Sequence, residues 1–238
     1  MRIMVVGASK GLGKALIDGL GDAGDTLIGV SRRRPTAWVA REGVQVEWIE
    51  ADLALETSVS HIEQQVVEHG LDVLVYNLGI WEAAAFDPAY AFLGDSDRQV
   101  RDIVDCNITA TILLIKRLLP LLLQSAAPRI LLTGSTSGLP QSGRPEVTFG
   151  ASKFALRGIA DALREGYRQQ KLGVTCLNLG YLNTDDDLSV PRAEAEQRGG
   201  GELIPLHDVV QVARMALSLS ASSFVKEITL PAILDERF

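Results

Sequence analysis

The chain has 238 residues, and 23 Lys and Arg against 30 Asp and Glu give it a formal charge of −7. Hydrophobic residues make up 47% and charged residues 22%, an ordinary globular composition that excludes intrinsic disorder and collagen-like structure. An acidic chain repels phosphate backbones, which disfavours a general nucleic-acid binder, although a local basic pocket can still hold a phosphorylated ligand.

Cysteine content and hydropathy bear on the cellular location. Cys106 and Cys176 are too few for a disulfide framework or a four-ligand zinc site, so we expect a reducing cytoplasm and no metal. The initial apolar run stops at Gly7, unlike the longer core of a secretion signal. The most apolar later stretch, residues 112–123, is interrupted by two basic residues and a proline. We therefore expect no membrane span.

Seven short β-branched or aliphatic runs predict strands at residues 3–6, 26–30, 44–49, 73–76, 130–133, 174–179 and 227–230. Longer stretches, several with apolar residues at helical spacing, predict helices at residues 12–20, 59–69, 98–124, 149–170 and 208–217. Alternating strands and helices imply right-handed βαβ units and a parallel sheet covered on both faces. The sequence therefore predicts one doubly wound α/β (Rossmann) domain over residues 1–238, with no linker that divides it.

The segment 183–206 is the least regular part of the chain. It carries aspartates at 185–187, a proline and three consecutive glycines. Its place after a strand favours a substrate lid, whereas its composition favours a solvated loop, and both interpretations stay open. The three aspartates are interpreted as a solvated face rather than a cation site.

A glycine-rich turn, Gly-Ala-Ser-Lys-Gly-Leu-Gly, follows the first predicted strand and opens the first predicted helix. Glycines let backbone N–H groups approach a pyrophosphate at the positive end of a helix. The context of strand, turn and helix therefore predicts a dinucleotide site. We expect the cofactor to contact Gly7, Ser9, Lys10, Gly11, Leu12 and Gly13.

The second predicted strand ends in a basic run, Ser31-Arg32-Arg33-Arg34. A protein that binds NAD often places an acid here on the ribose 2′-hydroxyl, and this run has none. Arg32, with Lys10 and Ser31, offers the charge and the donors to surround a 2′-phosphate. We therefore expect NADP(H). The plainer interpretation is a solvated basic loop, to which Arg33 and Arg34 can belong even if Arg32 does not.

The chain resembles the classical short-chain dehydrogenases/reductases (SDRs) over nearly its whole length. Besides the glycine turn, Ala51-Asp52-Leu53 is similar to the family segment near the adenine, and Asn77-Leu78-Gly79 to the Asn-Ala-Gly after the fourth strand. Gly180 and Thr184 fit the motif that contacts the nicotinamide carboxamide. The resemblance implies cofactor contacts at Asp52, Leu53, Asn77, Gly79, Lys153, Gly180 and Thr184.

The resemblance extends to the catalytic residues, with one departure. Asn107 and Ser135 fall where the family places its helix Asn and its catalytic Ser. The Tyr-x-x-x-Lys motif is here Phe149-Gly-Ala-Ser-Lys153, so the Lys is present and the Tyr is not. In the family the Ser binds the carbonyl oxygen, while the Lys holds the ribose and lowers the phenol pKa. Phenylalanine has no proton to exchange.

Three interpretations of Phe149 stay open. The protein has lost carbonyl chemistry and kept NADP(H) binding; another donor replaces the phenol, either Tyr181, Thr148 or a water held by Lys153 and Asn107; or the chain is a Tyr→Phe variant. The resemblance implies hydride transfer between NADP(H) and a small carbonyl or alcohol. The alternative function is a catalytically silent NADP(H)-binding redox sensor or assembly partner.

Family members commonly associate through the helices expected here at residues 98–124 and 149–170, so the resemblance implies a homodimer or homotetramer. The leucine-rich stretch at residues 118–123 suits either the core or a subunit contact. We interpret His61, His69, His207 and Cys106 as structural or solvated residues, with Cys106 buried. Substrate selection is expected in residues 80–95 and 183–206, where no motif identifies the substrate.

Overall fold

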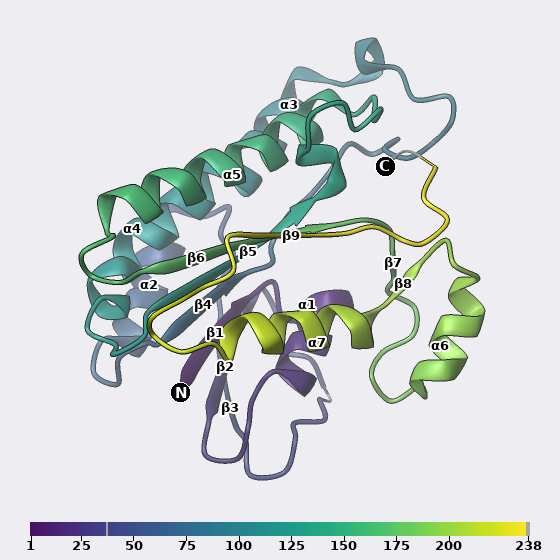
Figure 1. Cartoon of the computed structure of the whole chain (residues 1–238). Helices are drawn as coiled ribbons and strands as arrows, with labels where there is room; N and C mark the ends of the chain where they lie inside the picture. Colours follow the sequence, from purple (N-terminus) through teal and green to yellow (C-terminus); the bar gives the residue numbers. More distant parts are fainter. Residues whose placement is uncertain (37, 237–238) are drawn as a thin grey trace.

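The computed structural model describes residues 1–36 and 38–236, and its largest element is a seven-stranded parallel sheet in the order β3-β2-β1-β4-β5-β6-β9 (Figure 1). The strands are β1 Arg2–Val6, β2 Thr26–Ser31, β3 Gln45–Glu50, β4 Val73–Tyr76, β5 Arg129–Ser135, β6 Gly173–Leu179 and β9 Glu227–Leu230. All seven predicted strands are confirmed, with ends that differ by at most two residues. Strand order reverses between β1 and β4, which is where doubly wound sheets bind ligands at their carboxyl ends.

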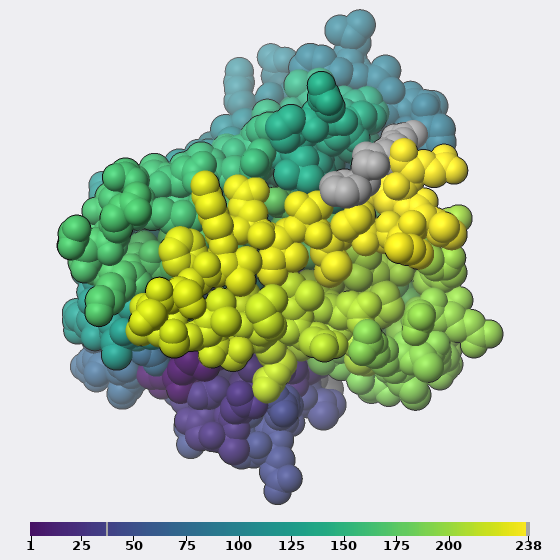
Figure 2. Space-filling view, in the orientation of Figure 1, coloured from purple at the N-terminus to yellow at the C-terminus, as the bar shows by residue number. Residues whose placement is uncertain are grey.

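Burial explains the arrangement of the strands. Every residue of β2, β4 and β6 is buried, as expected for central strands of a parallel sheet with both faces covered. The edge strand β3 has a mainly alternating pattern of exposed and partly buried residues. At the other edge, β9 joins the C-terminal part of the chain, which lies across the face of the molecule seen in Figure 2.

Helices cover both faces of the sheet (Figure 1). One hydrophobic cluster includes residues of α2 (Glu56–Val66), α4 (Ala110–Leu122) and α5 (Val147–Gly166), and the other includes residues of α1 (Gly11–Gly19) and α7 (Leu206–Leu217). The leucine-rich stretch of α4 belongs to the first cluster, because Leu118, Leu119, Leu121 and Leu122 are buried and Leu123 packs against them. Its leucines therefore serve the core of this chain.

The helix predicted over residues 98–124 is confirmed as one helical run, but it is not α-helical throughout. The structure has α3 (Asp97–Val104), a π-helical turn η2 (Asp105–Thr109) and then α4. The carbonyl oxygen of Asn107, in the middle of η2, accepts a hydrogen bond from the Thr111 hydroxyl at 2.8 Å. Single π-turns inside helices frequently occur at functional sites.

The segment 183–206 is more regular than its composition suggests. It contains α6 (Arg192–Gly199) and β8 (Ile204–Pro205), and β8 pairs with β7 (Leu182–Asn183). The sequence gives little sign of α6, because this short helix buries just Ala195 and Gly199 and has no apolar stripe. Short 3-10 turns, η1 (Phe92–Gly94) and η3 (Thr136–Gly138), complete the described elements. None of the helices in residues 1–36 and 38–236 is long and apolar enough to cross a membrane.

Candidate active site

The glycine turn joins β1 to α1 at the carboxyl edge of the sheet. Gly7 has a φ of 80° and Gly11 a φ of 51°, left-handed conformations that glycine adopts without strain. A Cβ at Gly13 would lie 1.9 Å from the Gly7 carbonyl oxygen, so this position admits no side chain without a backbone shift. The Gly7 N–H bonds the Val30 carbonyl at 2.9 Å, which ties the turn to β2.

The positive end of α1 is open to an anion. Within the described residues, the first turn of this helix has no acidic residue and no side-chain cap. The N–H groups of such a turn and the helix dipole favour a phosphate at this position. Lys10 is exposed just before the helix, and Gly11 lies near the Thr184 side chain. This arrangement fits the pyrophosphate of a dinucleotide.

In the basic run at the end of β2, Ser31 has a structural role and Arg32 is exposed. The Ser31 hydroxyl donates to the Arg33 carbonyl oxygen at 2.7 Å and accepts from the Trp48 indole at 3.2 Å. Ser31 is also buried, so its hydroxyl holds the loop in shape. Arg32 and Lys10 are exposed, and of the three residues expected around a 2′-phosphate they carry the positive charge.

Asn77 connects the ends of three strands. Its Nδ2 donates to the Gly7 carbonyl oxygen at 3.4 Å, and its Oδ1 accepts from the Thr133 hydroxyl at 3.1 Å. Asp52 lies on the loop after β3, where its carboxylate accepts a backbone N–H of the same loop at 3.1 Å. Leu53 packs against the core. Asn77 therefore supports the glycine turn from below, and Asp52 shapes its own loop.

Asn107 is buried in the π-turn, and both ends of its amide are engaged. Its Oδ1 accepts the Ile80 N–H at 2.8 Å, while its Nδ2 donates to the Ile80 carbonyl at 2.8 Å and the Ser152 hydroxyl at 2.9 Å. Because Ile80 follows β4 and Ser152 is on α5, the Asn107 side chain holds the loop after β4 against α5.

Lys153 brings an ammonium group into this buried region. Its Nζ donates to the Thr133 carbonyl oxygen at 2.9 Å and lies 3.4 Å from where a Cβ would stand on Gly79. Burial disfavours the charged form and lowers the pKa of Lys153 to about 8. An ammonium has three donors, so two remain for a ligand or water.

Phe149 and Ser135 complete the expected catalytic set. The Phe149 ring centroid lies 5.4 Å from the Lys153 Nζ, and the residue is 6% exposed. Ser135 ends β5, and its hydroxyl accepts the Ser137 N–H at 3.1 Å. The turn after Ser135 packs against α5, where the Ser137 carbonyl lies 3.5 Å from a Cβ placed on Gly150. The structure thus places the end of β5, where the resemblance expects the catalytic Ser, beside the helix that carries Phe149 and Lys153.

An aromatic cluster that the sequence patterns do not predict surrounds Phe149. Trp81 and Phe86, on the loop after β4, contact Phe149 edge to face with centroids 6.3 and 6.0 Å apart. Phe86 also contacts the Tyr181 ring edge to face at 5.5 Å. Such pairs stabilise apolar packing beyond the area that they bury. Position 149 is therefore a packing position in this chain, and no family motif marks its partners.

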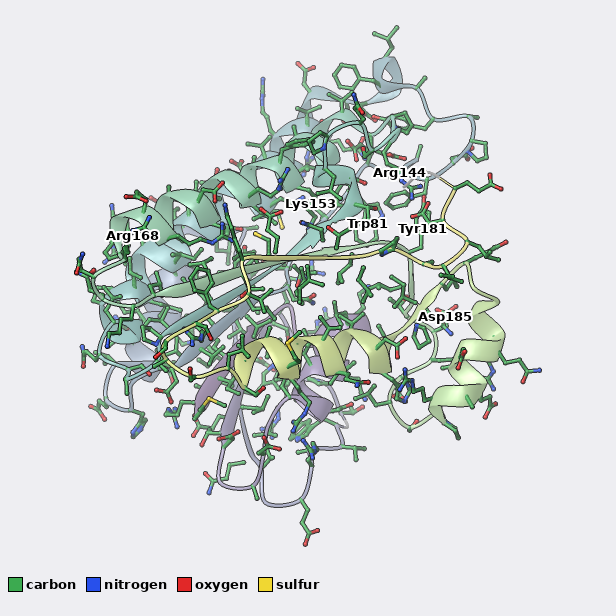
Figure 3. The ribbon with its side chains drawn as sticks, viewed as in Figure 1. Trp81, Arg144, Lys153, Arg168, Tyr181 and Asp185 are labelled. Carbon is green, nitrogen blue, oxygen red and sulfur yellow. The ribbon has the colours of Figure 1, made fainter. Side chains whose placement is uncertain are left out.

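Tyr181 is held by a buried ion pair that the sequence also did not reveal. Arg144 Nη1 donates to the Tyr181 hydroxyl at 2.6 Å, and its guanidinium lies over the ring at 4.4 Å. The Nη2 of Arg144 donates to both carboxylate oxygens of Asp235 at 3.1 and 3.0 Å. The two side chains are 5% and 3% exposed. Figure 3 shows Arg144, Tyr181 and Trp81 at the same end of the molecule.

Two buried glutamates join the loop after β4 to the start of α5. Glu82 Oε1 accepts the N–H groups of Thr148 and Phe149, both at 2.9 Å, and Glu146 Oε1 accepts the Phe86 N–H at 2.9 Å. Glu82 is 0% exposed, and among the described residues Oε2 of each glutamate is buried without a hydrogen-bond partner. The two carboxylates hold Phe86 and Phe149 in place from opposite sides of this contact.

The motif of Gly180 and Thr184, which the resemblance assigns to the nicotinamide, lies after β6 and beside the glycine turn. Gly180 follows β6, and a Cβ there would lie 3.1 Å from the backbone after β9. Thr184 is exposed near the start of α1. Asp187 accepts from Lys14 of α1 at 3.2 Å, which attaches the segment 183–206 to the nucleotide side. These contacts place the predicted nicotinamide residues at the carboxyl edge of the sheet.

The remaining candidates lie apart from this set. Asp186 pairs with Arg198, and within the described residues no group of three or more His, Cys, Asp or Glu side chains forms a metal site. His61 and His69 are exposed, and His207 is the second residue of α7. Cys106 is partly buried rather than buried, which corrects our expectation because one side of the π-turn is open. Burial raises the pKa of its thiol.

Comparison with known proteins agrees with this geometry. The sequence pattern of the family described as short chain dehydrogenase matches residues 1–195. The oxidoreductase YciK of Escherichia coli is 32% identical over 194 residues, which cover 76% of this chain and 73% of that protein. An NADPH-dependent pterin aldehyde reductase of Arabidopsis thaliana is 26% identical over 197 residues, 77% of this chain and 75% of that one.

A solved structure shares the fold. The alcohol dehydrogenase of Thermococcus sibiricus, complexed with 5-hydroxy-NADP, superposes with a TM-score of 0.77 at 18% identity, over 99% of this chain and 97% of that chain. The family pattern spans the glycine turn, Asn107, Ser135 and Lys153, all of which the structure places along the carboxyl edge of one sheet. By sequence and by fold, the chain belongs to the short-chain dehydrogenases, a family of oxidoreductases.

Proposed function

We propose that the chain is an NADP(H)-dependent oxidoreductase that acts on a small carbonyl or alcohol, with Phe149 in the acid/base position. The buried ammonium of Lys153 carries this proposal. Burial of a cation costs free energy, and Lys153 bonds a neutral carbonyl oxygen rather than a carboxylate. A buried charge without a charged partner is typical of a functional site. Gly79 and Phe149, which lie near the ammonium, belong to the family motifs.

The cofactor assignment is supported by the charges of the nucleotide side. When bound, NADP(H) supplies or accepts the hydride. The open end of α1 receives the pyrophosphate, while Arg32 and Lys10 neutralise the 2′-phosphate. Ser31 shapes the loop between them. Asp52 and Leu53 serve the adenine end, whereas Asn77, Gly79, Gly180 and Thr184 serve the ribose and nicotinamide end.

We assign the proton to Lys153, delivered directly or through a water. Phe149 has no proton to give, and Tyr181 is held by Arg144 with its ring against Phe86 rather than against position 149. Thr148 is buried beside Glu82. A pKa of about 8 lets Lys153 exchange protons near neutral pH. The Ser135 hydroxyl holds the reacting oxygen, and Asn107 keeps the loop and helix around it in register.

The aromatic cluster favours a second candidate function. Trp81 and Phe86 pack against Phe149, and Tyr181 packs against Phe86, on the side from which we expect a carbonyl substrate to approach position 149. A chain that binds NADP(H) but closes this side is a redox sensor or an assembly partner. Strong NADPH binding without turnover is its signature.

NADPH oxidation with a broad panel of carbonyl compounds separates the two functions. We expect slow turnover by the natural chain, none by Lys153→Met, and a gain of about 10²- to 10⁴-fold in Phe149→Tyr, the usual contribution of a positioned acid/base. Turnover by the natural chain should fall above pH 8, where Lys153 loses its proton. If neither the natural chain nor Phe149→Tyr turns over while NADPH binds, the second function holds. Equal or tighter binding of NADH overturns the cofactor assignment.

Three further assignments rest on the family. We propose a homodimer or homotetramer, supported by apolar residues exposed on α4 and α5, namely Ile112, Leu113 and Phe154. Light scattering at working concentration tests it, and a monomer overturns it. We also propose that the segment 183–206 covers the substrate and that the protein works in a reducing cytoplasm, as its two free thiols suggest.

A further inference from the structure

A cavity lies far from the aromatic cluster of Trp81, Phe86 and Phe149. It has a volume of about 620 Å³ and lies between the end of α5, the start of β6 and the loop before β9. Figure 3 shows Arg168, which lines it, at the opposite end of the molecule from Arg144 and Tyr181. Its volume is that of a small-molecule site. It stands at the amino ends of β5 and β6, whereas the cofactor residues stand at the carboxyl ends.

The cavity is basic in an acidic protein. Five basic and two acidic side chains line it, although the whole chain carries −7. The charged lining residues are Arg129, Arg164, Arg168, Lys171, Lys226, Asp161 and Glu165. The acids are already paired, since Asp161 bonds Arg164 at 2.7 Å and Lys226 at 3.3 Å, and Glu165 bonds Arg168. Positive charge is therefore left over.

Arg129 provides the strongest indication that an anion belongs in this cavity. It is 4% exposed, and its Nη2 donates to the carbonyl oxygens of Ser220 and Ser223 at 2.8 and 2.9 Å. Its Nε is buried without a partner among the described residues. Buried polar groups are almost always hydrogen-bonded, and a buried cation is normally paired. An anion in the cavity would compensate the charge of this buried guanidinium.

We propose that this cavity binds a small phosphorylated molecule. Guanidinium and ammonium groups form charge-assisted hydrogen bonds to phosphate oxygens, and the cavity offers them from Arg129, Arg168 and Lys171. Leu172 and Phe224 form an apolar wall for the organic part of the ligand.

The test is an NMR titration of the ¹⁵N-labelled full chain with inorganic pyrophosphate, because pyrophosphate has the proposed chemistry. Backbone amide shifts report the place of binding, which separates this cavity from the glycine turn. We expect saturable shifts at Leu172, Ser223 and Phe224. Shifts confined to residues 7–13 mean that only the cofactor turn binds the anion, and they overturn the proposal. Citrate is the second probe, and tighter binding of citrate overturns the phosphate class.

Matched variants test the residues. The double variant Arg168→Gln, Lys171→Asn removes two exposed cations, and Asn suits the left-handed backbone of Lys171, whose φ is 58°. We expect it to weaken pyrophosphate binding about tenfold or more, since charged hydrogen bonds are lost. Lys116→Gln removes an exposed charge from α4 and should leave binding unchanged.

A further variant is expected to strengthen pyrophosphate binding. An increase in affinity separates an effect of charge from general damage to the structure. Asp161→Asn frees Lys226 from its carboxylate and removes negative charge from the cavity wall. We expect tighter pyrophosphate binding. Equal affinity of the natural chain and all three variants overturns the proposal, and the amide spectrum of each variant shows that it is folded.

Discussion

The carboxyl edge of the sheet has a nucleotide side, at the glycine turn of residues 7–13, and a substrate side, around Phe149. The family motif is kept on the nucleotide side and changed on the substrate side. On the nucleotide side, Gly7 and Gly13 keep a backbone turn so close that a Cβ would lie 1.9 Å from a carbonyl oxygen. On the substrate side, Phe149 stands where the family resemblance expects the acid/base Tyr, and it packs against Trp81 and Phe86. The demand on a dinucleotide turn is steric and leaves few solutions, whereas the demand on a substrate pocket is chemical and admits many. Divergence is therefore expected on the second side.

The largest expected effect is on stability, and it tests how strongly the Arg144–Asp235 ion pair stabilises the substrate side. Asp235→Asn leaves the Arg144 guanidinium buried without its carboxylate, which should lower the free energy of unfolding by about 3–5 kcal/mol. Urea denaturation measures it. Asp185→Asn, at an exposed carboxylate labelled in Figure 3, is the control and should change stability by less than about 0.5 kcal/mol. Equal losses of unfolding free energy in the two variants would show that the Arg144–Asp235 ion pair does not stabilise this side.

The next effect is the pH dependence of stability that Lys153 causes. This residue lies between the nucleotide side and the substrate side. Burial lowers the pKa of Lys153 from 10.5 to about 8, so between these values the unfolded chain binds the proton and the folded chain does not. Stability of the cofactor-free protein must therefore gain about 3 kcal/mol from this group as pH rises through that window.

Lys153→Met removes this gain. The difference in unfolding free energy between the natural chain and the variant, measured from pH 7 to 11, isolates it, because the other titrating groups cancel. Parallel curves would place the ammonium in solvent and weaken its assignment as the proton source.

A third effect tests the steric demand of the nucleotide side. Gly13→Ala forces a Cβ against the Gly7 carbonyl and should cost about 2 kcal/mol of stability and abolish detectable NADPH binding. Gly158→Ala is the matched control, because nothing lies within 4 Å of a Cβ at this α5 position. It should stabilise the protein by about 0.5–1 kcal/mol. NADPH binding by Gly13→Ala would show that the turn tolerates change after all.

The same contrast explains what could be predicted from the sequence. All seven strands, five of the helical regions and the glycine turn follow from local patterns, because apolar runs and glycine spacing are read along the chain. The ring partners of Phe149 are as distant in sequence as Trp81 and Phe86, and Arg144 meets Asp235 across 91 residues. No local pattern encodes such contacts. The π-turn at Asn107 was missed because its cause is a side-chain network with Ile80 and Ser152.

The smallest effect concerns the carboxylate beneath Phe149. Glu82 accepts two N–H groups at the positive end of α5, where a negative charge is favourable. Glu82→Gln keeps an acceptor oxygen but removes the charge, so stability should fall by about 1 kcal/mol. Glu56→Gln, at the exposed first turn of α2, should cost less than about 0.5 kcal/mol. Because Glu82 holds the backbone of position 149, the substitution should also lower the turnover gained by Phe149→Tyr, and an unchanged gain would show that Phe86 and Trp81 alone position this residue.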